Sequence, residues 1–243
     1  AQRDQNSYIS SWSTAKSFTS FLIGIAIESG SIDSINDFAS KYISEWSSDE
    51  RSTITIKNLL DMRSGLVPIC YNPNIQDLSE CANASDSNSG GNIVYVDDQM
   101  SGCINRNLAA DGNHPWYENG SSIFIKGAFQ YSNCDTMVLG EILFRSTGQD
   151  LQTFAEYNLF SKIGISAFWW RDYTNFGQSN GNYLAYCCLD STARDFAKFG
   201  HMLLVGGIWE ESNQKYSSYV ELIKNLQSYG LQFWTICARP QSN

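Results

Sequence analysis

The chain has 243 residues, of which 42% are apolar and 17% charged, so it is long enough to fold around a sizeable core. Its formal net charge of −9 disfavours binding to phosphate backbones and anionic lipid, so we expect neither a nucleic-acid partner nor a membrane surface. No apolar stretch approaches the roughly 20 residues that span a bilayer. With two histidines and no Cys-x-x-Cys pair, the sequence predicts no metal site, and we expect no cofactor.

The first predicted element is a helix that begins at Ser13 and stops at Gly30. Apolar residues repeat along it at helical spacing: Phe18, Phe21, Leu22, Ile25 and Ala26. A second amphipathic stretch runs from about Ile35 to Trp46. Residues 53–56 alternate like a short strand and lead into a helix at 57–62.

Periodicity fades between residues 67 and 122, where Asn, Ser, Asp and Gly cluster from Cys81 to Asn92. This stretch is longer than ordinary connections, so we expect a lid, an insertion or both.

Cysteine placement bears on the cellular compartment. Four of the seven cysteines lie in or just after the polar stretch: Cys70, Cys81, Cys103 and Cys134. Cysteines in loops indicate disulfides formed in an oxidising compartment, so we expect a periplasmic or secreted protein, with free thiols as the alternative. The adjacent Cys187 and Cys188 do not have the spacing of a metal site.

The second half of the chain is predicted to be mainly helical. Expected helices cover 134–145 after a cap at Ser132 or Asn133, 151–160 after a cap at Asp150, a segment from Ser191 or Thr192 to Gly206, and 219–226. Short strands are expected at 167–171 and 231–236.

Ser13 and Lys16 carry the first chemical signal. Residues three positions apart share one helix face, so the amine can reach the hydroxyl. A lysine whose pKa is lowered by burial can take the proton of a serine nucleophile. The spacing alone is common, as Ser212 and Lys215 repeat it, and its ordinary interpretation is a capping serine and a surface lysine. Here it opens an apolar helix, which favours the catalytic interpretation.

Tyr131 and Asn133 form the second element, directly before a predicted helix. A phenol beside an ammonium group can exchange protons with a leaving group, and an amide can hold a lysine or a substrate. The alternative for Tyr131 is a ring that packs in the core. The bare spacing also occurs at Tyr173 and Asn175.

Four ordered blocks carry a family resemblance: 11–20 (SWSTAKSFTS), 61–66 (DMRSGL), 131–140 (YSNCDTMVLG) and 191–200 (STARDFAKFG). Together they resemble the class C β-lactamase-like serine hydrolases of the penicillin-recognising superfamily, nearest the 6-aminohexanoate-dimer hydrolase and esterase branch. The resemblance implies an α/β (α+β) fold of the β-lactamase/transpeptidase type.

By that resemblance, Ser13 is the catalytic nucleophile, Lys16 its general base and Tyr131 the proton carrier, while Asn133 binds substrate and holds Lys16. The backbone amide of Ser13 supplies half of an oxyanion hole. The family's third motif, Lys-Thr-Gly or a substitute, has no match after Gly207. We therefore expect one truncated domain over 1–243, an internal fragment dominated by its helical part, with much of the central sheet missing.

The resulting hypothesis is a serine hydrolase that cleaves amide or ester bonds of small molecules through an acyl-enzyme on Ser13. Two alternatives stay open. One is a β-lactamase or D-Ala-D-Ala carboxypeptidase. The other is an inactive ligand-binding or sensor module of the same fold, motivated by the unmatched third motif.

Overall fold

A computed structural model describes residues 4–66, 93–108, 129–172, 181–209, 214–226 and 229–234 of the chain. Its α-helices are α1 (Ala15–Glu28), α2 (Ile56–Leu60), α4 (Gln99–Ile104), α5 (Asn133–Thr147), α6 (Leu151–Ala155), α7 (Ser161–Ile163), α8 (Ala193–Leu204) and α9 (Ser217–Lys224). A π-helical turn, η7 (Glu156–Phe160), joins α6 to α7. The 3-10 turns are η1 (Trp12–Thr14), η2 (Ala39–Lys41), η3 (Ser44–Trp46), η4 (Glu50–Thr53) and η6 (Ile93–Tyr95).

Strands are short and few in the described part of the chain. They are β1 (Tyr8–Ser10), β2 (Ala167–Trp169), β3 (Leu189–Thr192), β4 (Ile208–Trp209), β5 (Gln214–Lys215), β6 (Tyr229–Gly230) and β7 (Phe233–Trp234). β3 lies between β1 and β2, antiparallel to both, with Ser191 opposite Ile9 on one side and Ala167 on the other. The two remaining pairs are antiparallel ribbons. Helix exceeds strand, as the sequence predicts.

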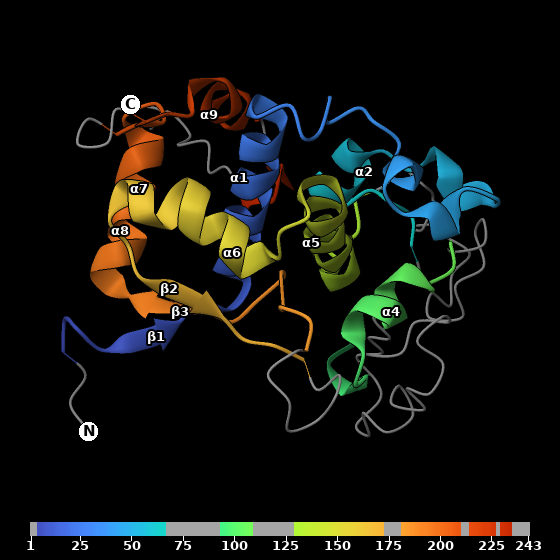
Figure 1. The fold of residues 1–243 in the computed structure, drawn as a ribbon, viewed down its shortest axis with the longest axis horizontal. Coiled ribbons are helices and arrows are strands. Elements are labelled where there is room, and N and C mark those ends of the chain that lie inside the picture. Colours follow the sequence, from blue (N-terminus) through green and yellow to red (C-terminus); the bar gives the residue numbers. More distant parts are fainter. Residues whose placement is uncertain are drawn as a thin grey trace, which may run out of the picture.

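Helix α1 forms the centre of the molecule (Figure 1), with α5 packed beside it. The small sheet and α6 to α8 lie on one side of this pair, and α2 and α4 lie on the other. The α1 side chains are buried nearly all round, and Phe18 stacks on Phe199 of α8 with ring centroids 3.8 Å apart. Burial on all faces is expected of a helix at the centre of a core.

Helix starts are confirmed where the sequence offers a capping side chain. Ser132 accepts from the backbone N–H of Asp135, and Asp150 accepts from the N–H of Thr153. Thr192 caps α8 in the same way. Each cap satisfies a backbone donor that the helix itself leaves unpaired.

The segment before α2 differs from the sequence prediction. The stretch from Ile35 to Trp46 forms two single 3-10 turns, because the backbone of residues 37–39 pairs with residues 54–56 instead of bonding helically. The strand expected at 53–56 is wrong. Thr53 ends η4, and Thr55 forms a capping box with Asn58 that starts α2.

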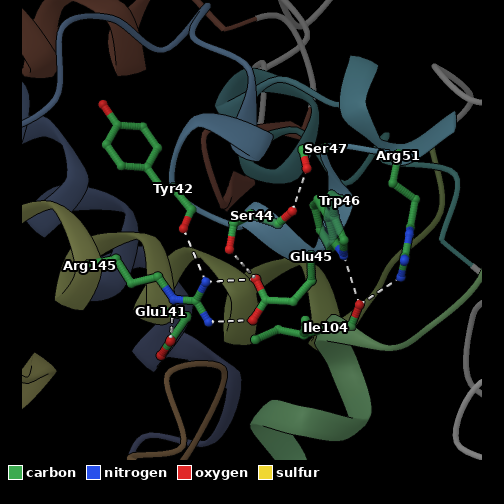
Figure 2. A network of polar contacts seen from close by, with 9 residues as sticks. All are labelled: Tyr42, Ser44, Glu45, Trp46, Ser47, Arg51, Ile104, Glu141 and Arg145. Atoms are coloured by element: carbon green, nitrogen blue, oxygen red, sulfur yellow. Dashed lines mark hydrogen bonds and ion pairs between the residues drawn. The ribbon is translucent and has the colours of Figure 1, made fainter. Parts of the chain in front are cut away.

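A polar network ties this segment to α5 and α4 (Figure 2). Arg145 of α5 donates to both carboxylate oxygens of Glu45, at 2.7 and 2.8 Å. Trp46 and Arg51 both donate to the carbonyl oxygen of Ile104, each at 2.7 Å. The network fixes the end of α4 beside the 3-10 turns.

Within the predicted lid, residues 93–108 are described and form η6 and α4, which packs on α5. The helix was missed because it is too short for a period and depends on its Asp98 cap and on a disulfide from Cys103 to Cys134 at the start of α5. The remainder of the 67–122 stretch, with Cys70 and Cys81, lies outside the described residues. The lid and the single truncated domain stay predictions.

None of the helices in the described ranges has the length and apolar character needed to cross a bilayer.

Candidate active site

Ser13 lies in the 3-10 turn η1, directly before α1. Its position depends on the preceding strand: β1 pairs with β3, and Ser11 then bonds Leu189 through both its backbone N–H and its side chain. Trp12, which lies between Ser11 and Ser13 in the chain, has a left-handed φ of 48°. Such backbone values in a non-glycine residue cluster at functional sites. Ser13 therefore lies in a 3-10 turn that leads into α1, two residues before α1 begins, which is close to the helix start that the sequence predicts.

Lys16 lies one turn along, with only 1% of its surface exposed. Its amine donates to Ser13 Oγ at 3.1 Å, to Asn133 Oδ1 at 2.9 Å and to the backbone oxygen of Tyr186 at 2.8 Å. All three acceptors are uncharged. Burial therefore lowers the pKa of Lys16 from 10.5 to about 7, because the charged form loses its hydration without gaining a counter-ion among these partners.

Tyr131 and Asn133 reach Lys16 from the start of α5. The ring centroid of Tyr131 lies 5.0 Å from the Lys16 amine, and 37% of the Tyr131 side chain surface is exposed. This is a contact between the ring face and an ammonium group. The structure thus brings together all four predicted site residues: Ser13, Lys16, Tyr131 and Asn133.

The family model described as Beta-lactamase matches residues 3–219. The chain belongs to the β-lactamase family.

A curated relative, the 6-aminohexanoate-dimer hydrolase of Paenarthrobacter ureafaciens, is 27% identical over 199 residues. The match covers 81% of this chain and 45% of that protein, so the chain spans about half the length of the curated relative. Both names point to a hydrolase.

Solved structures share the fold. A Bacillus anthracis protein provisionally named 6-aminohexanoate-dimer hydrolase aligns with a TM-score of 0.67 at 23% identity, over 96% of this chain and 60% of that one. A penicillin-binding protein from Bacillus halodurans gives 0.62 at 16%, over 95% and 71%. A class C β-lactamase from Rhodobacter sphaeroides gives 0.56 at 14%, over 90% and 56%. The chain has the β-lactamase/penicillin-binding-protein fold, with mixed helices and strands.

In this β-lactamase-family chain, the block at 61–66 contacts two elements next to the site, α5 and the β6–β7 hairpin. Ser64 donates to a carboxylate oxygen of the fully buried Asp135 at 2.7 Å, and burial raises the pKa of Asp135 to about 7. Asp61 accepts from the backbone N–H of Leu231 at 2.9 Å. These contacts join the 61–66 block to α5 and to the β6–β7 hairpin.

Two residues of the site are not marked by any sequence pattern. Tyr186 faces Lys16 with its carbonyl oxygen and with its ring, whose centroid is 5.4 Å from the amine. Gln232, in the β6–β7 hairpin, is buried and anchors that hairpin to α2 and α5. No motif spacing marks either residue, although the cysteine pair after Tyr186 is an unusual signal.

No group of three or more His, Cys, Asp or Glu side chains is placed to hold a metal ion within the described ranges. The arrangement that the structure presents is an exposed hydroxyl, a buried amine with a lowered pKa and a half-exposed phenol. Those groups suit proton transfer and nucleophilic attack.

Proposed function

We propose that the protein is a serine hydrolase that cleaves amide or ester bonds of small molecules through an acyl-enzyme on Ser13. One observation carries the proposal: the Lys16 amine lies 3.1 Å from Ser13 Oγ, in a buried setting that lowers its pKa to about 7. A neutral amine at hydrogen-bond distance is a competent general base for a serine hydroxyl.

In the proposed reaction, Lys16 takes the proton of Ser13 as Oγ attacks the substrate carbonyl carbon. The backbone N–H of Ser13 donates to the oxyanion that forms. Tyr131 carries the proton from the Lys16 ammonium group to the leaving amine or alcohol, and the C–N or C–O bond breaks. Water then attacks the acyl-enzyme while Lys16 accepts its proton. Lys16 returns that proton to Ser13 Oγ as the acyl C–O bond breaks, which frees the acid product and Ser13.

Asn133 is proposed to hold Lys16 and to bind the substrate. Its Oδ1 accepts from the amine, which leaves the amide nitrogen to meet a carbonyl or hydroxyl of the substrate.

The substrate class is proposed from the curated relative, whose name gives a dimer of 6-aminohexanoate as its substrate. β-Lactamase and penicillin-binding-protein neighbours at 14–16% identity share only the fold, so they do not favour a β-lactam or a peptidoglycan peptide.

A panel of substrates, assayed on the complete protein, tests the ranking: short ω-amino-acid amides, p-nitrophenyl esters and nitrocefin, each with wild type and Ser13→Ala. We expect hydrolysis of esters and amides that Ser13→Ala abolishes. Rapid nitrocefin turnover without ester or amide cleavage would move the function to β-lactamase. Binding of these compounds without any turnover would favour an inactive ligand-binding module.

We further propose a periplasmic or secreted location, which the two disulfides in the described residues support, since such bonds persist in oxidising compartments. Thiol alkylation of the protein in its source cells, followed by mass spectrometry, tests this. Alkylated Cys103 and Cys134 would contradict it.

A further inference from the structure

Cys187 and Cys188, neighbours in the chain, form a disulfide directly before β3. The residue before the pair, Tyr186, accepts a hydrogen bond from the Lys16 amine at 2.8 Å. The residue after it, Leu189, accepts from the backbone N–H of Ser11 at 2.9 Å. The disulfide therefore stands between the residue that holds the amine and the residue that holds the turn carrying the Ser13 hydroxyl.

The backbone at this disulfide has an unusual conformation. Cys188 has a φ of 63°, in the left-handed region that side chains other than glycine disfavour. Its carbonyl oxygen accepts from the N–H of Trp170 at 3.0 Å. A bond between adjacent cysteine side chains closes a small ring that includes the peptide unit between them. The ring restricts backbone torsions that would be free to relax in the reduced cysteines. The ring restrains ψ of Cys187 and φ of Cys188, and therefore the course of the backbone between the Tyr186 and Leu189 carbonyl groups.

We propose that the Cys187–Cys188 disulfide is a positioning group for the active site, which keeps the Tyr186 carbonyl on Lys16 and thereby keeps that amine buried and able to accept the proton of Ser13. The inference rests on the proposed function. With the ring open, Cys188 can leave the left-handed region, and the Tyr186–Cys187 peptide is then held by the hydrogen bond from the Cys187 N–H to the Leu184 carbonyl oxygen, at 3.0 Å. When the backbone relaxes and this bond is lost, the Tyr186 carbonyl turns away and water reaches the amine.

The direction of the effect follows from the groups around the amine. Among the described residues, the titratable side chains that face it are Tyr131, before α5, and Tyr186, whose pKa burial raises to about 12 so that it stays neutral. The remaining contacts are the uncharged Ser13 and Asn133. Loss of burial is then the dominant change, and hydration raises the pKa of Lys16 toward that of an ordinary lysine.

The Cys187–Cys188 disulfide is more exposed to solvent than the Cys103–Cys134 disulfide. Cys188 is partly exposed and Cys187 is 8% exposed, whereas Cys103 is 0% and Cys134 1% exposed. Dithiothreitol therefore opens the Cys187–Cys188 bond first. One thiolate of the reagent attacks a cysteine sulfur and forms a mixed disulfide. The second thiol of the reagent then attacks the reagent sulfur of that mixed disulfide and releases the cysteine. Two electrons pass to the cysteines, which end as thiols, and the reagent ends as a cyclic disulfide.

The experiment measures the rate at which a fluorophosphonate labels Ser13 as a function of pH. It uses wild type before and after brief reduction and desalting, with peptide mass spectrometry to confirm which disulfide is open. Two variants remove the ring permanently: Cys187→Ala/Cys188→Ala, and Cys187→Ala/Cys188→Gly, in which glycine accepts the left-handed φ. Reduction of the folded wild type avoids dependence on how the variants fold.

We expect the pH midpoint of labelling to rise by about one unit or more on reduction, so that labelling at pH 7 slows by about fivefold or more. The shift should be larger for Cys188→Ala than for Cys188→Gly, and dithiothreitol should have no further effect on either variant. A merely structural role would lower the rate at every pH without moving the midpoint. An unmoved midpoint in reduced wild type overturns the positioning role alone, whereas no labelling of untreated wild type at any pH overturns the proposed function and this inference with it.

Discussion

Lys16 donates a hydrogen bond to Asn133 over 2.9 Å, although the two residues lie 117 positions apart in the chain. The contact joins the first turn of α1 to the first residue of α5, so each helix start contributes one half of the site. Because the acceptor is an uncharged amide, it holds the amine without stabilising its protonated form as a carboxylate would. The following predictions depend on this arrangement.

The first concerns pH. The pKa of Lys16 is lowered to about 7, and the neutral amine is the active base, so kcat/KM should rise with pH through a midpoint near 7. At neutral pH this gives roughly a thousandfold more neutral amine than an ordinary lysine has. In Lys16→Arg the guanidinium stays protonated at every accessible pH, so it cannot accept the serine proton. We expect kcat/KM to fall about a hundredfold or more at every pH. A flat profile, or an active arginine variant, would contradict the role of Lys16.

Asn133→Asp is the second test. It places a carboxylate beside the amine, and an opposite charge at this distance raises the pKa of a lysine by about 1–3 units. The midpoint of the pH–rate profile should move up by that amount, with activity recovered at alkaline pH. Asn36→Asp makes the same change at an exposed site and should leave the midpoint in place. If both variants titrate like wild type, Asn133 does not control the amine.

Stability should depend on Gln232, which is 3% exposed. Its side chain accepts from Thr136 at 2.8 Å and donates to the carbonyl oxygen of Leu59 at 2.9 Å. Gln232→Leu leaves the buried Thr136 hydroxyl without this hydrogen bond and removes the side-chain donor to the Leu59 carbonyl oxygen, so we expect a loss of about 1–3 kcal/mol in the free energy of unfolding by urea. The exposed Gln149→Leu should change it by less than about 0.5 kcal/mol. Equal effects would show that the Gln232 contacts carry no special weight.

Helix packing provides a matched pair of glycine substitutions. A Cβ on Gly24 of α1 would lie 2.3 Å from a ring carbon of Tyr219 in α9, so Gly24→Ala should destabilise the fold by about 1–3 kcal/mol. Gly200 of α8 has open space around it, and Gly200→Ala should stabilise the fold by about 0.5–1 kcal/mol through helix propensity. Thermal melts of the two variants should therefore shift in opposite directions. Shifts of the same sign would mean that α9 does not press on α1 at Gly24.

Sequence reasoning succeeded where the signal is local. The helix after Ser13, the Ser132 cap and the Thr192 cap follow from side chains that satisfy neighbouring backbone groups or from apolar residues at helical spacing. The convergence of Ser13, Lys16, Tyr131 and Asn133 was predictable only because two motifs and their order resemble a family.

The features that were missed depend on contacts distant in sequence. Residues 35–46 have a helical pattern, but their backbone pairs with residues 54–56, and no periodicity reveals that pairing. Tyr186 reaches Lys16 through a backbone oxygen, which every residue type carries, so its identity gives no signal. The role of Gln232 depends on its hydrogen bond to α2, a tertiary contact that the sequence around Gln232 does not indicate.

The central claim is that Ser13 becomes acylated with the help of Lys16. Peptide mass spectrometry after reaction with a fluorophosphonate tests it most directly, because the labelled serine is identified by its position. We predict one phosphonate adduct, on Ser13, which disappears in Ser13→Ala, slows about a hundredfold or more in Lys16→Arg, and persists in Ser212→Ala. A folded protein that carries no adduct, or an adduct that remains in Ser13→Ala, would contradict the account.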